Sequence, residues 1–324
     1  MAASRYRLDP AIQAFVDASA GFAPADSSLA AKRTAFRSAC RAFTPTPPPG
    51  LVIQDQELHG LRLRLYQPQG TPPASGWPTV LYLHGGGWDL GDLDTHDWFV
   101  YRLAQRGPFA VLAVAYRLAP EHPFPAPLED ALAVWRALAG GHWPALDAQR
   151  LAVVGDSAGG CLAAGLCLAL RQAGEPQPRL QGLVYPVLSD REDLPSMLEH
   201  ADAPMLTRAG LALSLSAYVP TAQLRRDPRA LPLAAADLQG LAPAFIGIAE
   251  LDPLRDQGRA YHDRLLTAGV PVTLHQGHGL PHASLRALGV AEVELFYDAL
   301  GAALVYALAI SPETSSSHHM DTRT

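Results

Sequence analysis

The sequence predicts an α/β protein in which a mostly parallel sheet is covered by helices on both faces. Strand-like apolar runs alternate along the chain with segments of helical periodicity, as they do in βαβ units. Two of these runs, 79–83 and 109–116, are almost continuously apolar, as strands are when both of their faces are covered. The chain has 324 residues, of which 48% are hydrophobic, so it can bury a large core.

An N-terminal helical arm is expected over residues 1–45, where apolar residues such as Ile12 and Phe15 fall at helical spacing. The proline-rich stretch 44–50 then stops any helix. A half-exposed strand follows at 61–66, because apolar and basic residues alternate there.

The alternation of strands and helices continues to the end of the sheet domain. Strands are expected at 109–115, 151–154, 180–185, 243–249 and 270–274, and helices near 127–139, 158–173, 254–268 and 283–308. The segment 190–228 interrupts this order, and we expect it to pack with the arm as a cap over the carboxyl edge of the sheet. The predicted division is therefore a sheet domain of 46–189 and 229–310, a cap, and a polar, disordered tail at 311–324.

The composition argues against several classes of protein. The formal net charge is -6 and the Lys and Arg residues are scattered, so no basic stripe is available for a nucleic acid. No signal-peptide core follows Arg5 and Arg7, and no stretch approaches about 18 uninterrupted apolar residues, so we expect a cytoplasmic protein without a membrane span. Cys40, Cys161 and Cys167 form no C-x-x-C pair and are expected to be buried small hydrophobes.

Ser157 falls on the turn between the strand expected at 151–154 and the helix that follows. Such a sharp turn brings backbone segments close together, so only small residues fit two positions before and after the serine, where Gly155 and Gly159 stand. This G-x-S-x-G pattern is typical of the nucleophile turn of α/β-hydrolases, which holds the hydroxyl out at the edge of the sheet. A serine that merely caps the helix is the alternative.

Three consecutive glycines, 85–87, directly follow a strand-like run and His84. Glycine loses the most backbone freedom on folding, so this run makes sense if backbone N–H groups must approach a ligand atom closely. We expect the N–H groups of Gly85 and Gly86, with that of Ala158, to form an oxyanion hole. A glycine-rich turn or a phosphate loop is the alternative, but no GK[ST] or G-x-G-x-x-G context follows.

A serine hydroxyl is a poor nucleophile unless a base takes its proton and a third group orients that base. Asp252 stands at the end of an expected strand, just before Pro253 and a helix, where it can point into the cleft or cap the helix. Glu250 and Asp256 are rival acids. We favour Asp252, because Glu250 is nearer the strand body and Asp256 falls inside the helix.

Three histidines compete for the role of the base. His275 continues an expected strand, His278 falls early in the next loop, and His282 ends that loop just before the helix expected at 283–308. Three such close histidines also suggest a metal site, but no carboxylate or cysteine companion on a rigid frame accompanies them. We therefore predict His282 as the general base, with the other two at the surface.

These stretches together resemble the hormone-sensitive-lipase-like carboxylesterases, the bacterial family IV of serine esterases. The resemblance covers residues 50–300 and rests on HGGGW, GDLDTHD, YRLAPEHPFPAPLEDA, GDSAGG, DPLRDQG and the His282 loop, which occur in this order. It implies an α/β-hydrolase fold with an eight-stranded sheet and a helical cap. It also implies no metal or organic cofactor, and a homodimer is plausible through the final strand and helix. The implied catalytic triad is Ser157, Asp252 and His282, and the implied oxyanion hole is Gly85, Gly86 and Ala158.

The resemblance has two departures near the expected pocket. Family members usually continue the base histidine as His-Gly-Phe, whereas Ala283 and Ser284 follow it here, and Asp89 stands where an apolar residue is frequent. We expect Trp88, Tyr185 and Leu206 to line the pocket.

The expected activity is hydrolysis of short- to medium-chain acyl esters, which are small molecules, through an acyl-enzyme intermediate. The alternatives are an amidase, lactonase or carbamate hydrolase with the same triad, and a non-catalytic ligand receptor on the same fold. The receptor is disfavoured because His282 is retained.

Overall fold

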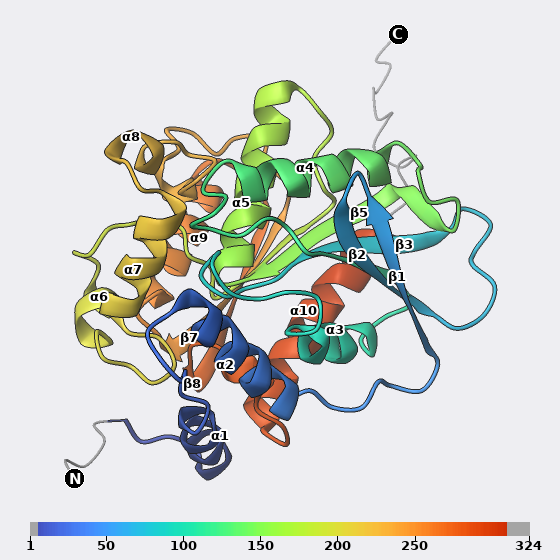
Figure 1. Ribbon diagram of the computed structural model, residues 1–324. Helices are drawn as coiled ribbons and strands as arrows, with labels where there is room; N and C mark the ends of the chain where they lie inside the picture. The colour runs from blue at the N-terminus through green and yellow to red at the C-terminus, as the bar shows by residue number, and fades with distance from the viewer. Residues whose placement is uncertain (1–5, 310–324) are drawn as a thin grey trace, which may run out of the picture.

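The computed structural model describes residues 6–309 and contains a single sheet in that range (Figure 1). Its strand order is β1-β2-β4-β3-β5-β6-β7-β8. The strands are β1 Leu51–Leu58, β2 Leu61–Pro68, β3 Trp77–Leu83, β4 Ala110–Val114, β5 Leu146–Asp156, β6 Gln181–Val184, β7 Ala244–Leu251 and β8 Val272–Pro281. Only the pairs β1–β2 and β2–β4 are antiparallel. The prediction of a mostly parallel, eight-stranded α/β sheet is therefore confirmed.

Helices pack on both faces of this sheet, and each face has its own hydrophobic core. The helices are α1 Pro10–Ala20, α2 Leu29–Ala42, α3 Asp97–Ala104, α4 Ala126–Ala139, α5 Ala158–Ala173, α6 Pro195–Glu199, α7 Arg208–Tyr218, α8 Ala222–Arg225, α9 Arg255–Thr267 and α10 Ala291–Ala309. Helices α4, α5 and α9 share one core, whereas α3 and α10 share the other (Figure 1). The continuous apolar strands of the sequence are the central ones that both cores cover.

The N-terminal arm and the 190–228 segment attach to different faces of the sheet domain. Ile12 and Phe15 of the arm belong to the core that contains α3 and α10. Leu215 and Tyr218 of α7 belong to the opposite core. The two segments nevertheless lie near each other at one end of the molecule (Figure 1), where both contribute walls to the same cavity.

The end of the chain differs from the expected helix at 283–308. Strand β8 runs on to Pro281, and the helix begins only at Ala291. Ala283 has a φ of 57° and Gly289 a φ of 71°, which are left-handed values that a right-handed helix excludes. A short 3-10 turn, Ser284–Arg286, occupies part of the interval. The tail predicted at 311–324 lies outside the described residues.

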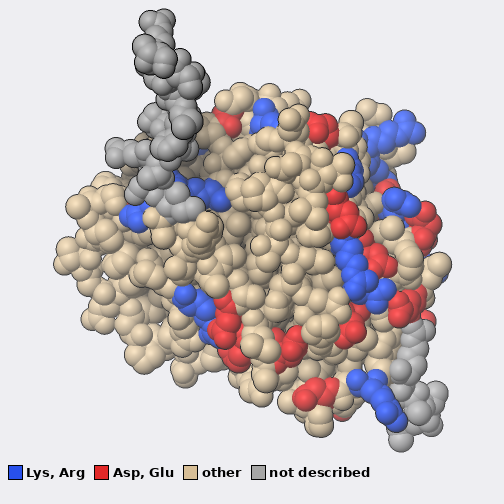
Figure 2. Space-filling model, turned by 180° about the vertical axis from the view of Figure 1, so that it is seen from behind, with Lys and Arg blue, Asp and Glu red and all other residues tan. Residues whose placement is uncertain are grey.

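Charged side chains on the face seen from behind do not form a patch of one sign, because Lys and Arg are interspersed with Asp and Glu (Figure 2). No helix within residues 6–309 is long and apolar enough to cross a membrane. The three cysteines are free and buried, as expected.

Candidate active site

Ser157 occupies a strained position between β5 and α5. Its φ of 54° and ψ of -116° are unusual for a residue with a side chain. The flanking glycines make the turn possible: a Cβ on Gly159 would lie 1.9 Å from the carbonyl oxygen of Leu83, and a Cβ on Gly155 would lie 2.2 Å from the backbone of Gly159. The serine is thus held at the carboxyl edge of the sheet, at the N-terminus of α5.

His282 and Asp252 meet Ser157 at this edge. The Nε2 atom of His282 lies 3.0 Å from the Ser157 Oγ, and its Nδ1 atom lies 2.7 Å from the Asp252 Oδ2. Asp252 is fully buried, and its Oδ1 accepts a hydrogen bond of 2.8 Å from the Leu254 N–H, which fixes the carboxylate. Asp252 follows β7 and His282 follows β8, so parallel strand ends deliver both groups.

The rival residues are engaged elsewhere. The Glu250 carboxylate accepts a hydrogen bond from the Gly279 N–H, and Asp256 forms an ion pair with Arg255. His275 and His278 both belong to β8, so His278 is not the loop residue that we expected. Within residues 6–309, no group of three or more His, Cys, Asp or Glu side chains is arranged to hold a metal ion.

The glycine loop after β3 differs in one respect from the expected oxyanion hole. The Gly85 N–H donates a hydrogen bond of 2.9 Å to the Asp156 Oδ1, so it is not free to face a substrate oxygen, and the expected role of Gly85 does not agree with this geometry. Gly86 and Gly87 have φ values of 111° and 62° and line the cavity beside Ser157. The N–H groups of Gly86, Gly87 and Ala158 make no hydrogen bond to any described residue.

Asp156 holds the glycine loop against the nucleophile turn. Its Oδ1 also accepts a hydrogen bond of 2.6 Å from the Tyr82 hydroxyl, and its Oδ2 lies 3.7 Å from the His96 Nε2. Burial opposes ionisation of Asp156, but attraction to His96 and the hydrogen bonds outweigh it and lower its pKa. The sequence analysis gave Asp156 no role, although its position directly before Ser157 could have indicated that it lies at the site.

His84, the first residue of the loop, is a buried neutral histidine. Its ring stacks on Tyr116, with centroids 4.2 Å apart, and on His96. Burial, with repulsion from His96, lowers the pKa of His84 to about 4.

A cavity of about 420 Å³ opens beside Ser157 and His282. The arm contributes residues such as Phe22 and Phe36 to its walls, and the 190–228 segment contributes residues such as Leu206. Trp88 also lines the cavity and stacks on Tyr218, with centroids 4.2 Å apart.

Tyr185 does not line the cavity, contrary to expectation. Its ring packs against the His282 ring, with centroids 4.8 Å apart. Both departures from the family pattern do reach the cavity, since Ala283 and Asp89 line it. Burial raises the pKa of Asp89 to about 6.

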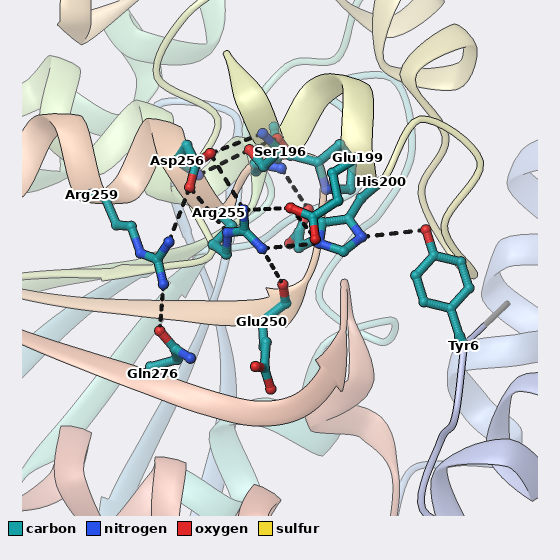
Figure 3. Close-up of polar contacts among 12 residues, drawn as sticks. Tyr6, Ser196, Glu199, His200, Glu250, Arg255, Asp256, Arg259 and Gln276 are labelled. Carbon is teal, nitrogen blue, oxygen red and sulfur yellow. Dashed lines mark hydrogen bonds and ion pairs between the residues drawn. The ribbon is translucent and has the colours of Figure 1, made fainter.

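A polar network joins the N-terminal arm and the 190–228 segment to the loop that carries Asp252 (Figure 3). The Tyr6 hydroxyl of the arm lies 3.3 Å from the Nδ1 of His200, and the Arg255 Nη1 lies 3.1 Å from its Nε2. Arg255 also forms ion pairs with Glu199 and with Asp256. Since Arg255 starts α9 three residues after Asp252, this network connects the position of Asp252 to that of the arm and of the 190–228 segment.

Comparisons with known proteins agree with this architecture. Residues 80–286 match the alpha/beta hydrolase fold family. The chain is 38% identical over 291 residues to Esterase LipI of Mycobacterium tuberculosis, a match that covers 87% of this chain and 89% of LipI. It is 42% identical over 238 residues to the ethyl acetate hydrolase of Pseudomonas putida, covering 73% of this chain and 75% of that protein.

A solved structure gives the same result. The crystal structure of a thermostable esterase from Pseudomonas putida superimposes with a TM-score of 0.88 at 29% identity, over 96% of this chain and all of that one. The chain therefore belongs to the alpha/beta hydrolase fold family, within the hormone-sensitive-lipase-like esterases whose motifs it carries.

Proposed function

We propose that this protein is a serine carboxylesterase that hydrolyses short- to medium-chain acyl esters. The observation that carries the proposal is the chain of contacts from Ser157 through His282 to Asp252, at 3.0 and 2.7 Å, on a strained turn beside a cavity. A nucleophile, a base and an orienting acid in this order are the requirements of acyl transfer through a covalent intermediate. The names of the relatives, which include an esterase and an ethyl acetate hydrolase, support the same activity.

In the proposed mechanism, Ser157 attacks the ester carbonyl while the His282 Nε2 accepts its proton. Asp252 accepts the Nδ1–H hydrogen bond, keeps the ring in the required tautomer and stabilises the imidazolium. His282 then protonates the departing alcohol, and a water molecule repeats the sequence on the acyl-enzyme.

The N–H groups of Gly86, Gly87 and Ala158 are proposed to stabilise the oxyanion. Each is free of other hydrogen bonds to described residues, and the two glycines line the cavity. A donor of this kind contributes about 10²- to 10³-fold to turnover in enzymes that use it.

The arm and residues 190–228 are proposed to act as the cap that shapes the substrate pocket. Both segments supply walls of the cavity, while the triad residues stand at the sheet edge. We also propose that two copies of the chain pair through β8 and α10 at the open edge of the sheet. Size-exclusion chromatography with light scattering tests this pairing, and a protein that elutes only as a monomer would contradict it.

The deciding experiment is hydrolysis of p-nitrophenyl butyrate by wild type, Ser157→Ala and the matched control Ser38→Ala. Ser38 is an exposed serine of α2 and makes no contact with the cavity. We expect activity to vanish in Ser157→Ala and to stay at the wild-type level in Ser38→Ala. Turnover by folded Ser157→Ala near the wild-type level would disprove the mechanism. A parallel panel of amides, lactones and carbamates tests the alternative substrates.

A further inference from the structure

Arg286 is a buried cation in the wall of the catalytic cavity. It stands four residues after His282, has a relative exposure of 5%, and lines the same cavity as Ser157. Its Nη1 donates to the Cys40 Sγ at 3.3 Å, and its Nε lies 3.5 Å from the Ala283 carbonyl oxygen. These contacts are weak partners for a guanidinium group.

No carboxylate of the described residues lies within 4.0 Å of the Arg286 guanidinium, and its Nη2 donates no hydrogen bond to residues 6–309. Buried arginines are normally paired, because a charge taken out of water needs a partner. Arg102 shows the usual arrangement in this same protein. It is equally buried, and it binds the Glu294 carboxylate and the carbonyl oxygens of Leu285 and Ala287.

Aromatic faces surround the Arg286 guanidinium, and no carboxylate of residues 6–309 lies within 4.0 Å of it, although Asp89 and Asp156 line other parts of the same cavity. The guanidinium carbon lies 5.6 Å from the ring centre of Phe15 and 5.7 Å from that of Phe36, so cation–π contacts stabilise part of the charge. Trp98 lines the same cavity, and its buried Nε1–H has no hydrogen-bond acceptor in the described structure. A guanidinium without a counter-ion and an N–H donor without an acceptor, both in the wall of one cavity, match a ligand group with negative charge and acceptor oxygens.

We propose that Arg286 is a specificity-determining residue that binds a carboxylate carried by the substrate, so that the preferred substrates are esters with a free carboxylate on the acyl part. This inference rests on the proposed esterase function and names the substrate class for its site. The guanidinium would form a charge-assisted, bidentate pair with the substrate carboxylate, and this pair would supply the partner that the protein does not provide.

The test compares two ester series of matched shape. One series is the monoethyl esters of the C3 to C6 dicarboxylic acids, and the other replaces the terminal carboxylate by an isopropyl group, as in ethyl 5-methylhexanoate for monoethyl glutarate. Ethanol release is measured for wild type, Arg286→Met, Arg286→Lys and a control. The control is Arg41→Met, which removes an exposed charge from the N-terminal arm, next to Cys40 in the sequence. Melting temperatures show which variants are folded.

We expect wild type to have the higher kcat/KM for at least one carboxylate ester of the series. Arg286→Met should lose about 10- to 100-fold on that ester and stay within about threefold on its neutral partner, because a hydrogen bond to a charged group is lost only in the first case. Arg286→Lys should keep part of the preference, and Arg41→Met all of it.

Two results would overturn the inference. Equal losses on both esters in folded Arg286→Met would make Arg286 only a structural tether between the arm and the His282 loop. A wild-type enzyme that prefers every neutral ester would also reject it, and this comparison needs no variant to fold. Failure to hydrolyse any ester in either series would instead count against the proposed esterase function.

Discussion

The carboxylate of Asp156 accepts a hydrogen bond of 2.9 Å from the backbone N–H of Gly85, 71 residues earlier in the chain. This bond ties the glycine loop to the residue directly before Ser157. There is no room for a side chain at the junction, because a Cβ on Gly85 would lie 2.4 Å from the Asp156 Oδ2. The relative position of Ser157 and the proposed oxyanion donors therefore depends on Asp156.

Replacement of Asp156 by Asn should lower kcat on p-nitrophenyl butyrate by about 10- to 100-fold with little change in KM, since a displacement of the donors by a fraction of an ångström affects the transition state most. Tyr82→Phe removes one partner of Asp156 but keeps the Gly85 bond, and it should have a smaller effect. Steady-state kinetics on folded variants measures both. An unchanged kcat in Asp156→Asn would show that the loop holds its position without this carboxylate.

Asp252→Asn should reduce kcat by about 10³- to 10⁴-fold, because an amide at this position favours the wrong tautomer of His282. Glu250→Gln is the matched control: it changes a carboxylate two residues away that binds the Gly279 N–H and does not contact His282. Its kcat should stay within a few fold of wild type. If Glu250→Gln had the larger effect, the assignment of the acid would be wrong.

Gly159→Ala should destabilise the protein by about 3 kcal/mol or more, since its Cβ would lie 1.9 Å from a backbone oxygen that cannot move independently of β3. Gly141→Ala provides the comparison. Gly141 has a φ of 74° and open space around it, so only the left-handed conformation is penalised, at about 1 to 2 kcal/mol. Chemical denaturation gives both values, and similar costs at the two positions would contradict the packing argument.

The contribution of His84 to the free energy of unfolding should fall as the pH drops from about 6.5 to about 4, whereas the contribution of Asp89, whose pKa burial raises to about 6, should change in the opposite sense. His84 stays neutral in the folded protein down to a pKa of about 4, whereas it takes up a proton near pH 6.5 when unfolded, so acid favours the unfolded chain by a few kcal/mol at most. Denaturant titrations at pH 4.5, 5.5 and 7.5 measure the effect.

The dependence on His84 can be separated from other titrations. Relative to wild type, His84→Gln should remove close to one proton from the difference in protons bound by the unfolded and folded states in this window. His142→Gln, at an exposed histidine, is the control and should match wild type. If His84→Gln does not fold, NMR titration of the wild-type imidazole reports the pKa directly. A His84 pKa near 6.5 would refute the prediction.

Much of the site could be predicted from the sequence because it depends on local patterns. The strand-to-helix turn at Ser157 requires small neighbours, and Asp252 and His282 directly follow strands of one parallel sheet. Such features are visible as glycine spacing and as polar residues at the ends of apolar runs.

The remaining features depend on partners that are distant in the sequence. Asp156 decides the use of the Gly85 N–H, because it accepts that hydrogen bond. Tyr185 is buried behind His282 because it follows β6, which pairs with β7, and because its ring also packs against Phe296 of α10. The prediction that a helix starts at residue 283 was wrong. Apolar residues there follow helical spacing, but the left-handed φ values of Ala283 and Gly289 prevent a helix. The special environment of Arg286 could not be predicted from the sequence, because the absence of a counter-ion depends on three-dimensional packing alone.

Part of the cavity wall comes from the arm and from 190–228, whereas the proposed reacting groups come from the sheet edge. Substitutions in these two segments therefore leave the strand ends and their hydrogen bonds untouched. Natural variation and laboratory selection can accordingly explore new acyl preferences in these two surface segments, while the hydrolytic chemistry is inherited unchanged.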